Sequence, residues 1–261
     1  MSKIHHIMEN PRAMRRGIDM VGRLLRLGRL PGVYRVHPWA KPSGTDMRWL
    51  PMNQNIGLPA GAPIPVSLLD RLIEEASHRV IFDHCGCRVA YECKGYDHRI
   101  GCLLMGDSAL EAIGPHSREV GVEEAVAHAR KAVENGLVPV TGKARVDNLL
   151  FGVKERRRLL TVCFCCECCC ITRFTAGMPA DKLDPIFPRL DGAVVELTGE
   201  CTGCGRCASR CYMKAIEVVD GRAVISSSCR ACGRCASVCP EGAIEIRIED
   251  PLFLEKARER I

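Results

Sequence analysis

The feature that most constrains this chain is a duplicated run of cysteines near its C-terminus. Each run has the spacing C-x2-C-x2-C-x3-C, and the second begins 28 residues after the first. The eight members are Cys201, Cys204, Cys207, Cys211, Cys229, Cys232, Cys235 and Cys239. Residues 215–218 and 243–246 repeat at the same offset, as Ala-Ile-Glu-Val and Ala-Ile-Glu-Ile. Because the repeat includes a stretch with strand character, it is a duplicated structural unit and not two isolated metal knuckles.

The spacing within each run favours a polynuclear metal centre over other uses of cysteine. Gaps of two residues let three thiolates converge on one centre while backbone N–H groups of the loop point toward the sulfurs. A structural zinc site needs only two C-x2-C pairs, so the third and fourth cysteines of each run would have no role. Disulfides are disfavoured further, because cysteine-rich intracellular proteins usually hold metal instead.

These runs resemble those of the bacterial two-cluster ferredoxins, whose pattern is C-x2-C-x2-C-x3-C-P. The resemblance covers residues 194–248 and implies two 4Fe-4S clusters that exchange single electrons. In that family the fourth cysteine of each run ligates the other cluster. The implied ligands are Cys201, Cys204, Cys207 and Cys239 for the first cluster, and Cys229, Cys232, Cys235 and Cys211 for the second.

The chain departs from that family at one position and in its charge. Tyr212 follows the fourth cysteine of the first run, where the family has proline, whereas Pro240 keeps the pattern in the second run. We expect altered packing at Tyr212 and unchanged metal ligation. Residues 194–248 carry seven Arg and Lys against six Asp and Glu. Freely diffusing ferredoxins of this type are acidic, so the near-neutral balance indicates a relay built into a larger complex.

Ten further cysteines lie upstream in two groups. They are Cys85, Cys87, Cys93 and Cys102 in the first group, and Cys163, Cys165, Cys166, Cys168, Cys169 and Cys170 in the second. Adjacent residues of a strand point to opposite faces, so a regular strand cannot aim the whole second group at one metal. Four interpretations stay open: a further 4Fe-4S cluster on the first group, a mixed or unusual cluster that draws on both groups, zinc, and redox-active or inert thiols. The ten cysteines are thus candidate ligands of one or two additional iron–sulfur clusters.

The central cysteine region resembles largely uncharacterised iron–sulfur proteins of anaerobic bacteria and archaea. The shared motifs are C-x-C-R, then G-C-L, then a C-x-C-C-x-C-C-C run ahead of a ferredoxin module, and the likeness covers residues 60–250. It implies anaerobic redox metabolism and no particular substrate. Two non-cysteine candidates nearby are His84 and Arg88, as donors to cluster sulfur or ligands of iron, with polar surface residues of a loop as the favoured alternative. Lys94, Asp97 and His98 fit a solvated loop better than an anionic pocket.

Apolar periodicity and turn residues predict an α+β chain. We expect helices at 66–79 and 122–135, the second ended by Gly136, and strands at 80–82, 137–141, 148–153 and 159–162. The expected parts are a basic helix with a proline-rich wrapping segment (1–65), a cysteine-rich α+β domain (66–175), a linker (176–193), a two-cluster ferredoxin-like domain (194–248) and a tail (249–261).

Residues 14–30 predict a basic amphipathic helix. Met14, Ile18, Val21 and Leu25 fall on one helical face and five arginines on the other. Three glycines weaken this helix on its own, so it needs a surface to pack on. We expect that surface to be the protein's own core, with a partner subunit and an anionic membrane surface as the two alternatives.

Several function classes lack support in the sequence. No apolar run approaches the roughly 18 residues of a spanning helix, and the segment after Arg15 and Arg16 lacks the uncharged stretch of an export signal. We therefore expect a cytoplasmic protein. The chain has no dinucleotide fingerprint, P-loop or haem-attachment motif, and no nucleic-acid fold signature. Nucleotide, covalent haem and nucleic acid are therefore not expected ligands.

These observations lead to one expectation for function and two alternatives. We expect a protein that relays single electrons through 4Fe-4S clusters between redox partner proteins, as a subunit of a larger anaerobic complex. The first alternative is an oxidoreductase component, a reductase with a substrate-binding iron–sulfur site among the central cysteines. The second is a thiol-based assembly or activation factor. No catalytic residue is assigned.

Overall fold

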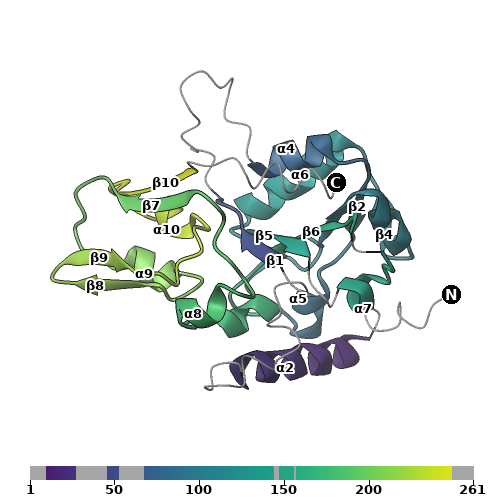
Figure 1. Cartoon of the computed structure of the whole chain (residues 1–261), viewed down its shortest axis with the longest axis horizontal. Helices are drawn as coiled ribbons and strands as arrows, with labels where there is room; N and C mark the ends of the chain where they lie inside the picture. Colours follow the sequence, from purple (N-terminus) through teal and green to yellow (C-terminus); the bar gives the residue numbers. More distant parts are fainter. Residues whose placement is uncertain (1–9, 28–45, 53–67, 144–146, 156, 249–261) are drawn as a thin grey trace.

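The structure, a computed structural model, describes residues 10–27, 46–52, 68–143, 147–155 and 157–248. In these residues helices and antiparallel strands are mixed along the chain, which confirms the α+β class. A six-stranded sheet forms the centre, and two two-stranded sheets lie in the C-terminal region (Figure 1). None of the described helices is long and apolar enough to cross a lipid bilayer.

The central sheet is antiparallel throughout, in the order β1-β5-β6-β3-β2-β4. Its strands are β1 (Asp46–Trp49), β2 (Arg79–Phe82), β3 (Leu103–Met105), β4 (Ser117–Glu119), β5 (Val138–Lys143) and β6 (Leu160–Cys165). Strand β6 lies between β5 and β3, with Cys163 opposite Val140 and Thr161 opposite Leu104. It is buried along most of its length, as expected for a strand with neighbours on both edges. Strand β6 therefore carries the first cysteines of the second group into the interior.

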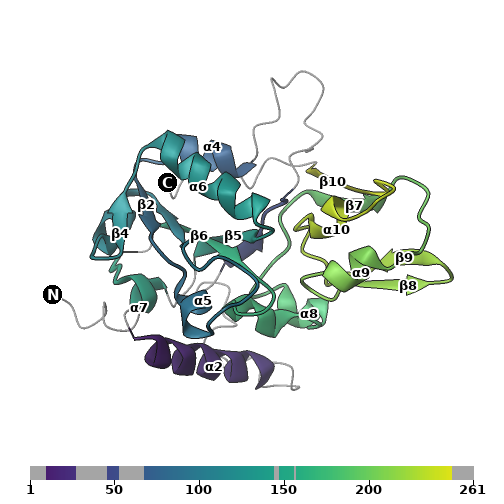
Figure 2. The ribbon, with the colours of Figure 1, turned by 180° about the vertical axis from the view of Figure 1, so that it is seen from behind.

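Helices lie on both sides of this sheet. Helices α4 (Leu68–Glu75) and α6 (Val122–Glu134) pack together on one side, and α2 (Pro11–Leu27) and α5 (Gly86–Ala90) lie on the other (Figure 1, Figure 2). Helix α6 ends at Glu134, one residue before its predicted end, and Gly136 takes the left-handed φ of +74° just beyond it. Helix α4 ends before its predicted end, because Arg79 already belongs to β2.

The apolar face of α2 is buried in the protein's own core, as expected. Its buried side chains include Met14, Ile18, Val21 and Leu25. They face α5 and the short helix η2 (Ile171–Thr175), both of which neighbour central cysteines. Two of its arginines lie over aromatic rings, with Arg15 5.1 Å from the ring of Tyr91 and Arg26 5.2 Å from that of Phe174. The helix thus closes one side of the cysteine-rich region.

The predicted strand at 148–153 is wrong, because Asp147–Phe151 form helix α7. Asp147 lies in the first turn, where an acidic side chain stabilises the positive end of the helix dipole. Periodicity alone does not show whether a short apolar run forms a buried helix or a buried strand. Phe151 still points inward, and its ring centroid lies 5.2 Å from that of Phe82.

The proline-rich segment contributes one strand to the sheet. Strand β1 pairs with β5 at the sheet edge, with Trp49 opposite Val140. The ranges 31–45 and 53–65 of the expected wrapping segment lie outside the described residues. Trp49 is fully buried and anchors this edge strand in the core.

The C-terminal repeat folds with its two halves interleaved. Its elements are β7 (Ala193–Leu197), α9 (Arg206–Arg210), β8 (Ile216–Val219), β9 (Arg222–Ile225), α10 (Arg234–Ser237) and β10 (Ile244–Ile248). Strand β8 forms a hairpin with β9, whereas β10 pairs with β7, which precedes the first cysteine run. Both repeated apolar stretches are therefore strands, as predicted, and the second half closes on the start of the first.

The segment that joins the two regions is packed against them. Residues 176–193 contain the short helix α8 (Ala180–Leu183) and bury six apolar side chains, those of Met178, Leu183, Ile186, Phe187, Leu190 and Ala193. Trp49 of the central sheet meets Phe187 and Tyr212 edge-on, at ring-centroid distances of 5.5 and 6.3 Å. One hydrophobic core therefore continues from the sheet into the C-terminal repeat.

A glycine next to a central cysteine tests how tightly this region is packed. A Cβ at Gly101 would lie 2.0 Å from the carbonyl oxygen of Phe82, so Gly101→Ala must push the loop before β3 away from β2. We expect the free energy of unfolding to fall by about 1–3 kcal/mol and the thermal midpoint to fall by several degrees. Circular dichroism in the absence of oxygen measures that midpoint. Gly95→Ala is the matched control, because nothing lies within 4 Å of its Cβ position. Equal midpoints for the two variants would contradict the described packing.

Candidate metal centres

Two small cavities in the C-terminal repeat are each lined by four cysteines. The first, of about 10 Å³, is lined by Cys201, Cys204, Cys207 and Cys239. The second, of about 20 Å³, is lined by Cys211, Cys229, Cys232 and Cys235. Each cavity thus combines three cysteines of one run with the fourth of the other. This is the crossed grouping that the resemblance to two-cluster ferredoxins implies.

Backbone N–H groups point at the cysteine sulfurs in both halves of the repeat. The N–H of Ala215 lies 3.2 Å from Cys211 Sγ, and that of Ala243 lies 3.3 Å from Cys239 Sγ. These two contacts occupy equivalent positions of the repeat. Helices α9 and α10 each begin after a left-handed glycine, Gly205 and Gly233, which turns the loop around its cavity. Such donors stabilise negative charge on sulfur, so the loops suit thiolate ligands of a metal centre.

The two cavities differ in their exposure. Cys204 of the first cavity is exposed, and N–H groups of Ala223 and Gly203 lower the pKa of Cys201. Burial instead raises the pKa of Cys229, and that of Cys232 to about 12, in the second cavity. The first cavity therefore lies nearer to solvent, and the second is shielded by the rest of the protein.

The structure divides the ten central cysteines differently from the sequence. Neither sequence group stays together, because each contributes to two sites. Cys93 joins Cys166, Cys168 and Cys169 in one site. The other six line a separate cavity, and they are Cys85, Cys87, Cys102, Cys163, Cys165 and Cys170. The first interpretation, a cluster on Cys85, Cys87, Cys93 and Cys102 alone, therefore does not match the structure, because Cys93 lies in the other site.

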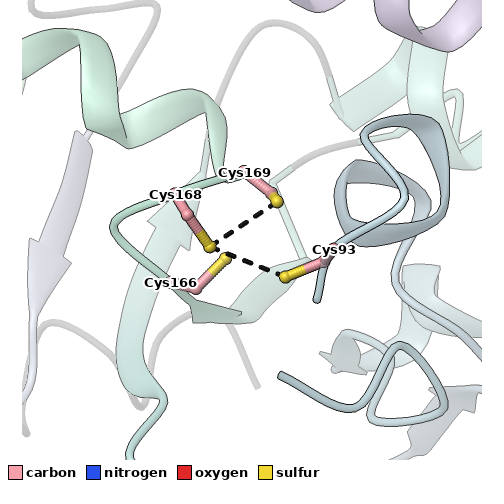
Figure 3. A group of neighbouring side chains, drawn as sticks. All are labelled: Cys93, Cys166, Cys168 and Cys169. Carbon is pink, nitrogen blue, oxygen red and sulfur yellow. Dashed lines mark hydrogen bonds between the residues drawn. The ribbon is translucent and has the colours of Figure 1, made fainter. Parts of the chain in front are cut away.

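The four-cysteine site brings its sulfurs close together. All four Sγ atoms lie within 4.8 Å of one another, and Cys168 Sγ lies 3.5 Å from Cys93 Sγ and 3.6 Å from Cys169 Sγ (Figure 3). In the described part of the chain, no second set of three Cys, His or acidic side chains meets this spacing. Burial raises the pKa of Cys166 to about 11 and that of Cys168 to about 12. Without a metal these two thiols are protonated at neutral pH.

The six-cysteine cavity is about 100 Å³ and otherwise lined mostly by apolar side chains. The cysteines reach it from the first residues of α5, the loop before β3, strand β6 and the start of η2. Cys165 Sγ lies 2.9 Å from Cys170 Sγ, and Cys102 Sγ lies 3.7 Å from Cys163 Sγ. Hydrogen bonds from Cys165 and Cys87 lower the pKa of Cys170, and donating that bond raises the pKa of Cys165. These contacts favour the thiolate form of Cys170 over that of Cys165.

The end of β6 explains this division. Cys163 and Cys165 are two residues apart on the strand and so point to the same side, toward the cavity. The strand ends at Cys165, and the chain then turns, so Cys166, Cys168 and Cys169 face the other site while Cys170 returns to the cavity. The expectation that a regular strand cannot aim all six at one metal is confirmed.

Arg88 lies buried beside the six-cysteine cavity. Its side chain is among the largest fully buried ones, and its guanidinium donates to the carbonyl oxygens of Asp97 at 3.0 Å and Phe164 at 2.7 Å, and to that of Ile100. No carboxylate among the described residues forms an ion pair with it. Burial opposes the charge of Arg88, yet nearby cysteines, Cys85 first, hold its pKa above the ordinary value. The hydrogen bonds of the Arg88 guanidinium thus go to main-chain carbonyls, and its interaction with the cysteines is electrostatic.

The other sequence candidates lie outside these sites. The His84 ring meets that of His116 edge-on at 5.0 Å, and burial lowers its pKa. Asp97 pairs with the exposed Arg99 at 3.0 Å, which lowers the pKa of Asp97 to about 2. Lys94 and His98 are exposed in the same loop. This loop is solvated, as the sequence favoured.

Two side chains that sequence reasoning did not assign connect the C-terminal repeat to the central cysteines. Tyr212 is buried, and its hydroxyl donates to the Cys166 carbonyl at 3.2 Å and pairs with Thr172 Oγ1. Thr172 Oγ1 in turn lies 3.3 Å from Cys170 Sγ. Arg234 of α10 donates to Glu167, which lies between two central cysteines, at 2.7 Å. The only sequence signal for this connection between the two regions was Tyr212, which stands where the ferredoxin pattern has proline.

Comparison with known proteins supports the assignment of the repeat. The model of a family described as "4Fe-4S dicluster domain" matches residues 200–244. Neither the curated proteins nor the solved structures contain a match to this chain. The C-terminal repeat is therefore a 4Fe-4S-binding module, and its electron-transfer chemistry follows from that group. The match does not extend to the central cysteines.

The role of Tyr212 in holding the two regions together is testable by substitution. Tyr212→Phe removes the hydroxyl that hydrogen-bonds to Thr172 and to the carbonyl of Cys166, and we expect the free energy of unfolding to fall by about 1–3 kcal/mol. Tyr212→Pro restores the residue of the ferredoxin pattern but also removes a packed ring, with an expected loss of about 3–5 kcal/mol. Pro240→Tyr, at the exposed equivalent position, is the control and should change stability by roughly 0.5 kcal/mol or less. Thermal unfolding without oxygen measures all three, and a harmless Tyr212→Pro would refute this role.

Proposed function

We propose that this protein relays single electrons through 4Fe-4S clusters, as a subunit of a larger anaerobic redox complex. The observation that carries the proposal is the pair of cavities in the repeat, each lined by three cysteines of one run and the fourth of the other. When bound, each cluster supplies a one-electron couple whose potential depends on hydrogen bonds to sulfur and on solvent exposure. The protein would position the clusters and determine both the hydrogen bonds to their sulfurs and their exposure to solvent.

The proposed ligands are the four cysteines of each cavity. The chain's own groups prepare both sites for negative charge, because backbone N–H groups already point at Cys201, Cys211, Cys229 and Cys239. No acid–base group is required, since outer-sphere electron transfer breaks no bond in the protein. The exposure of Cys204 suits the first site to exchange electrons with a partner, and the shielded second site to pass them inward.

The charge distribution supports a subunit over a freely diffusing carrier. The module is close to neutral, and the outer face of α2 carries exposed arginines, among them Arg12, Arg16 and Arg23. Met20 and Leu27 are exposed on the same helix at 60% and 47%. Arginine with exposed apolar side chains is a composition typical of protein interfaces. We therefore assign the outer face of α2 to contact with a partner subunit.

The two alternatives differ in what they require of the central cysteines. A reductase with a substrate-binding iron–sulfur site draws support from the six-cysteine cavity, which is enclosed by apolar side chains. A thiol-based assembly factor needs exposed thiols of low pKa. Hydrogen bonding and burial raise the pKa of Cys87, Cys163 and Cys165. Hydrogen bonds lower the pKa of Cys85, to about 7, and that of Cys170, but both thiols are buried, which disfavours thiol exchange there.

The crossed ligand assignment is tested by iron and sulfide content after purification without oxygen. We expect Cys239→Ala to lose about four irons per chain, and Cys204→Ala/Cys239→Ala to lose no more than that, because both residues serve one cluster. Cys232→Ala/Cys239→Ala should lose about eight. Ser209→Ala, an exposed site between two ligands, is the control that keeps all of them. A loss of about eight irons in Cys204→Ala/Cys239→Ala would contradict the assignment.

A further inference from the structure

The six-cysteine cavity has a size that sets it apart from the two cavities of the 4Fe-4S module. It measures about 100 Å³, against about 10 and 20 Å³ for the cavities that four cysteines each line in the repeat. The larger cavity also has six thiols in its lining, where each module cavity has four. Two thiols beyond the four ligands of a cubane fit an occupant with more metal ions.

The lining of this cavity excludes water and polar small molecules as its natural occupants. Apart from the cysteines, Asp147 and Thr172, the side chains that line it are apolar, among them Val21 and Leu25 of α2, Met47 of β1, Ile100 and Phe187. A buried water needs two to four polar partners, and apolar cavities stay dry. Thiolates are soft ligands, and a single zinc ion takes only four of them. Six thiols around one cavity therefore match a polynuclear metal–sulfur core.

The charge of Arg88 gives an independent reason for an anionic occupant. Its guanidinium is buried and donates to main-chain carbonyls, and no described carboxylate forms an ion pair with it. A buried cation without an anionic partner is costly. Arg88 directly follows Cys87, which lines this cavity together with Cys85. A thiolate-bound cluster would provide the missing negative charge.

We propose that the six-cysteine cavity holds an iron–sulfur cluster larger than a 4Fe-4S cubane, ligated by Cys85, Cys87, Cys102, Cys163, Cys165 and Cys170. A short route connects it to the second module cluster. Tyr212 directly follows the ligand Cys211, its hydroxyl pairs with Thr172 Oγ1, and Thr172 contacts Cys170 Sγ at 3.3 Å. The proposal rests on the proposed function in one respect only, that electrons reach this cluster from the module.

Metal content of cavity variants tests this proposal. We expect Cys102→Ala/Cys163→Ala to lose more than four irons per chain with the matching sulfide, while the module keeps its EPR signals after reduction with dithionite. Met47→Leu lines the same cavity without a thiol and conserves volume, so it should keep its full iron content. The retained module signals show that the variant has folded.

Two outcomes would overturn the proposal. A loss of four irons or fewer in Cys102→Ala/Cys163→Ala means a cubane or no cluster in the cavity. An equal loss in Met47→Leu means that packing, and not ligation, holds the iron. Neither outcome touches the proposed function, which fails only if the module itself lacks its eight irons.

The four-cysteine site carries a second inference from a different observation. We infer that Cys93, Cys166, Cys168 and Cys169 hold one zinc ion and no cluster. Tetrahedral zinc with bonds of about 2.3 Å places its sulfurs about 3.8 Å apart. The Sγ atoms here lie within 4.8 Å of one another, with pairs at 3.5 and 3.6 Å (Figure 3). The distinguishing feature is that all four sulfurs lie mutually close, as the ligands of one tetrahedral ion do. The six-cysteine cavity has close pairs too, Cys165–Cys170 at 2.9 Å and Cys102–Cys163 at 3.7 Å, but among the described residues neither those cysteines nor the module cysteines form a mutually close set of three.

Metal analysis of the purified chain separates a zinc ion from a cluster. We expect about one zinc per chain, lost in Cys93→Ser/Cys168→Ser with iron and sulfide unchanged. Gly95→Ala, in the same loop but with open space around its Cβ position, should keep the zinc. Loss of iron or sulfide from the double variant, or absence of zinc from the wild type, would overturn this inference.

Discussion

The exchange of one cysteine between the two halves of the C-terminal repeat is the constraint on which the rest of the structure depends. Cys239 lies with the first run and Cys211 with the second, so neither cavity is complete within one half. The pairing of β10 with β7 has the same crossed character. Under the proposed ligation, a cluster in either cavity would tie both halves together, so that metal binding would stabilise the fold of the whole repeat.

This crossed module is fixed to the central sheet at the point where it departs from the ferredoxin pattern. Tyr212 stands next to Cys211 and reaches the loop that follows β6, while Arg234 reaches Glu167 in the same loop. Both contacts end among the central cysteines. Trp49 packs against Phe187 and Tyr212, so apolar contacts as well as hydrogen bonds connect the module to the central sheet. A module held in this way stays at a fixed distance from the central cysteines.

The sequence predicted those features that depend on local spacing. The repeat, its strands and the end of α6 at Gly136 follow from residues close together in the chain. The partition of the ten central cysteines does not, because it depends on strand β6 ending at Cys165 and on loops from 75 residues away meeting there. Helix α7 was missed because a short apolar run fits either secondary structure. The sequence marked Arg88 and Tyr212 as candidates, but their contacts became visible only with their burial, which a single sequence does not give.

The most direct test of this account is anomalous diffraction at the iron edge from crystals grown without oxygen. The account predicts one four-iron density in the cavity of Cys201, Cys204, Cys207 and Cys239, and another in that of Cys211, Cys229, Cys232 and Cys235. Iron bound by four cysteines of a single run, or either cavity without iron, would contradict it.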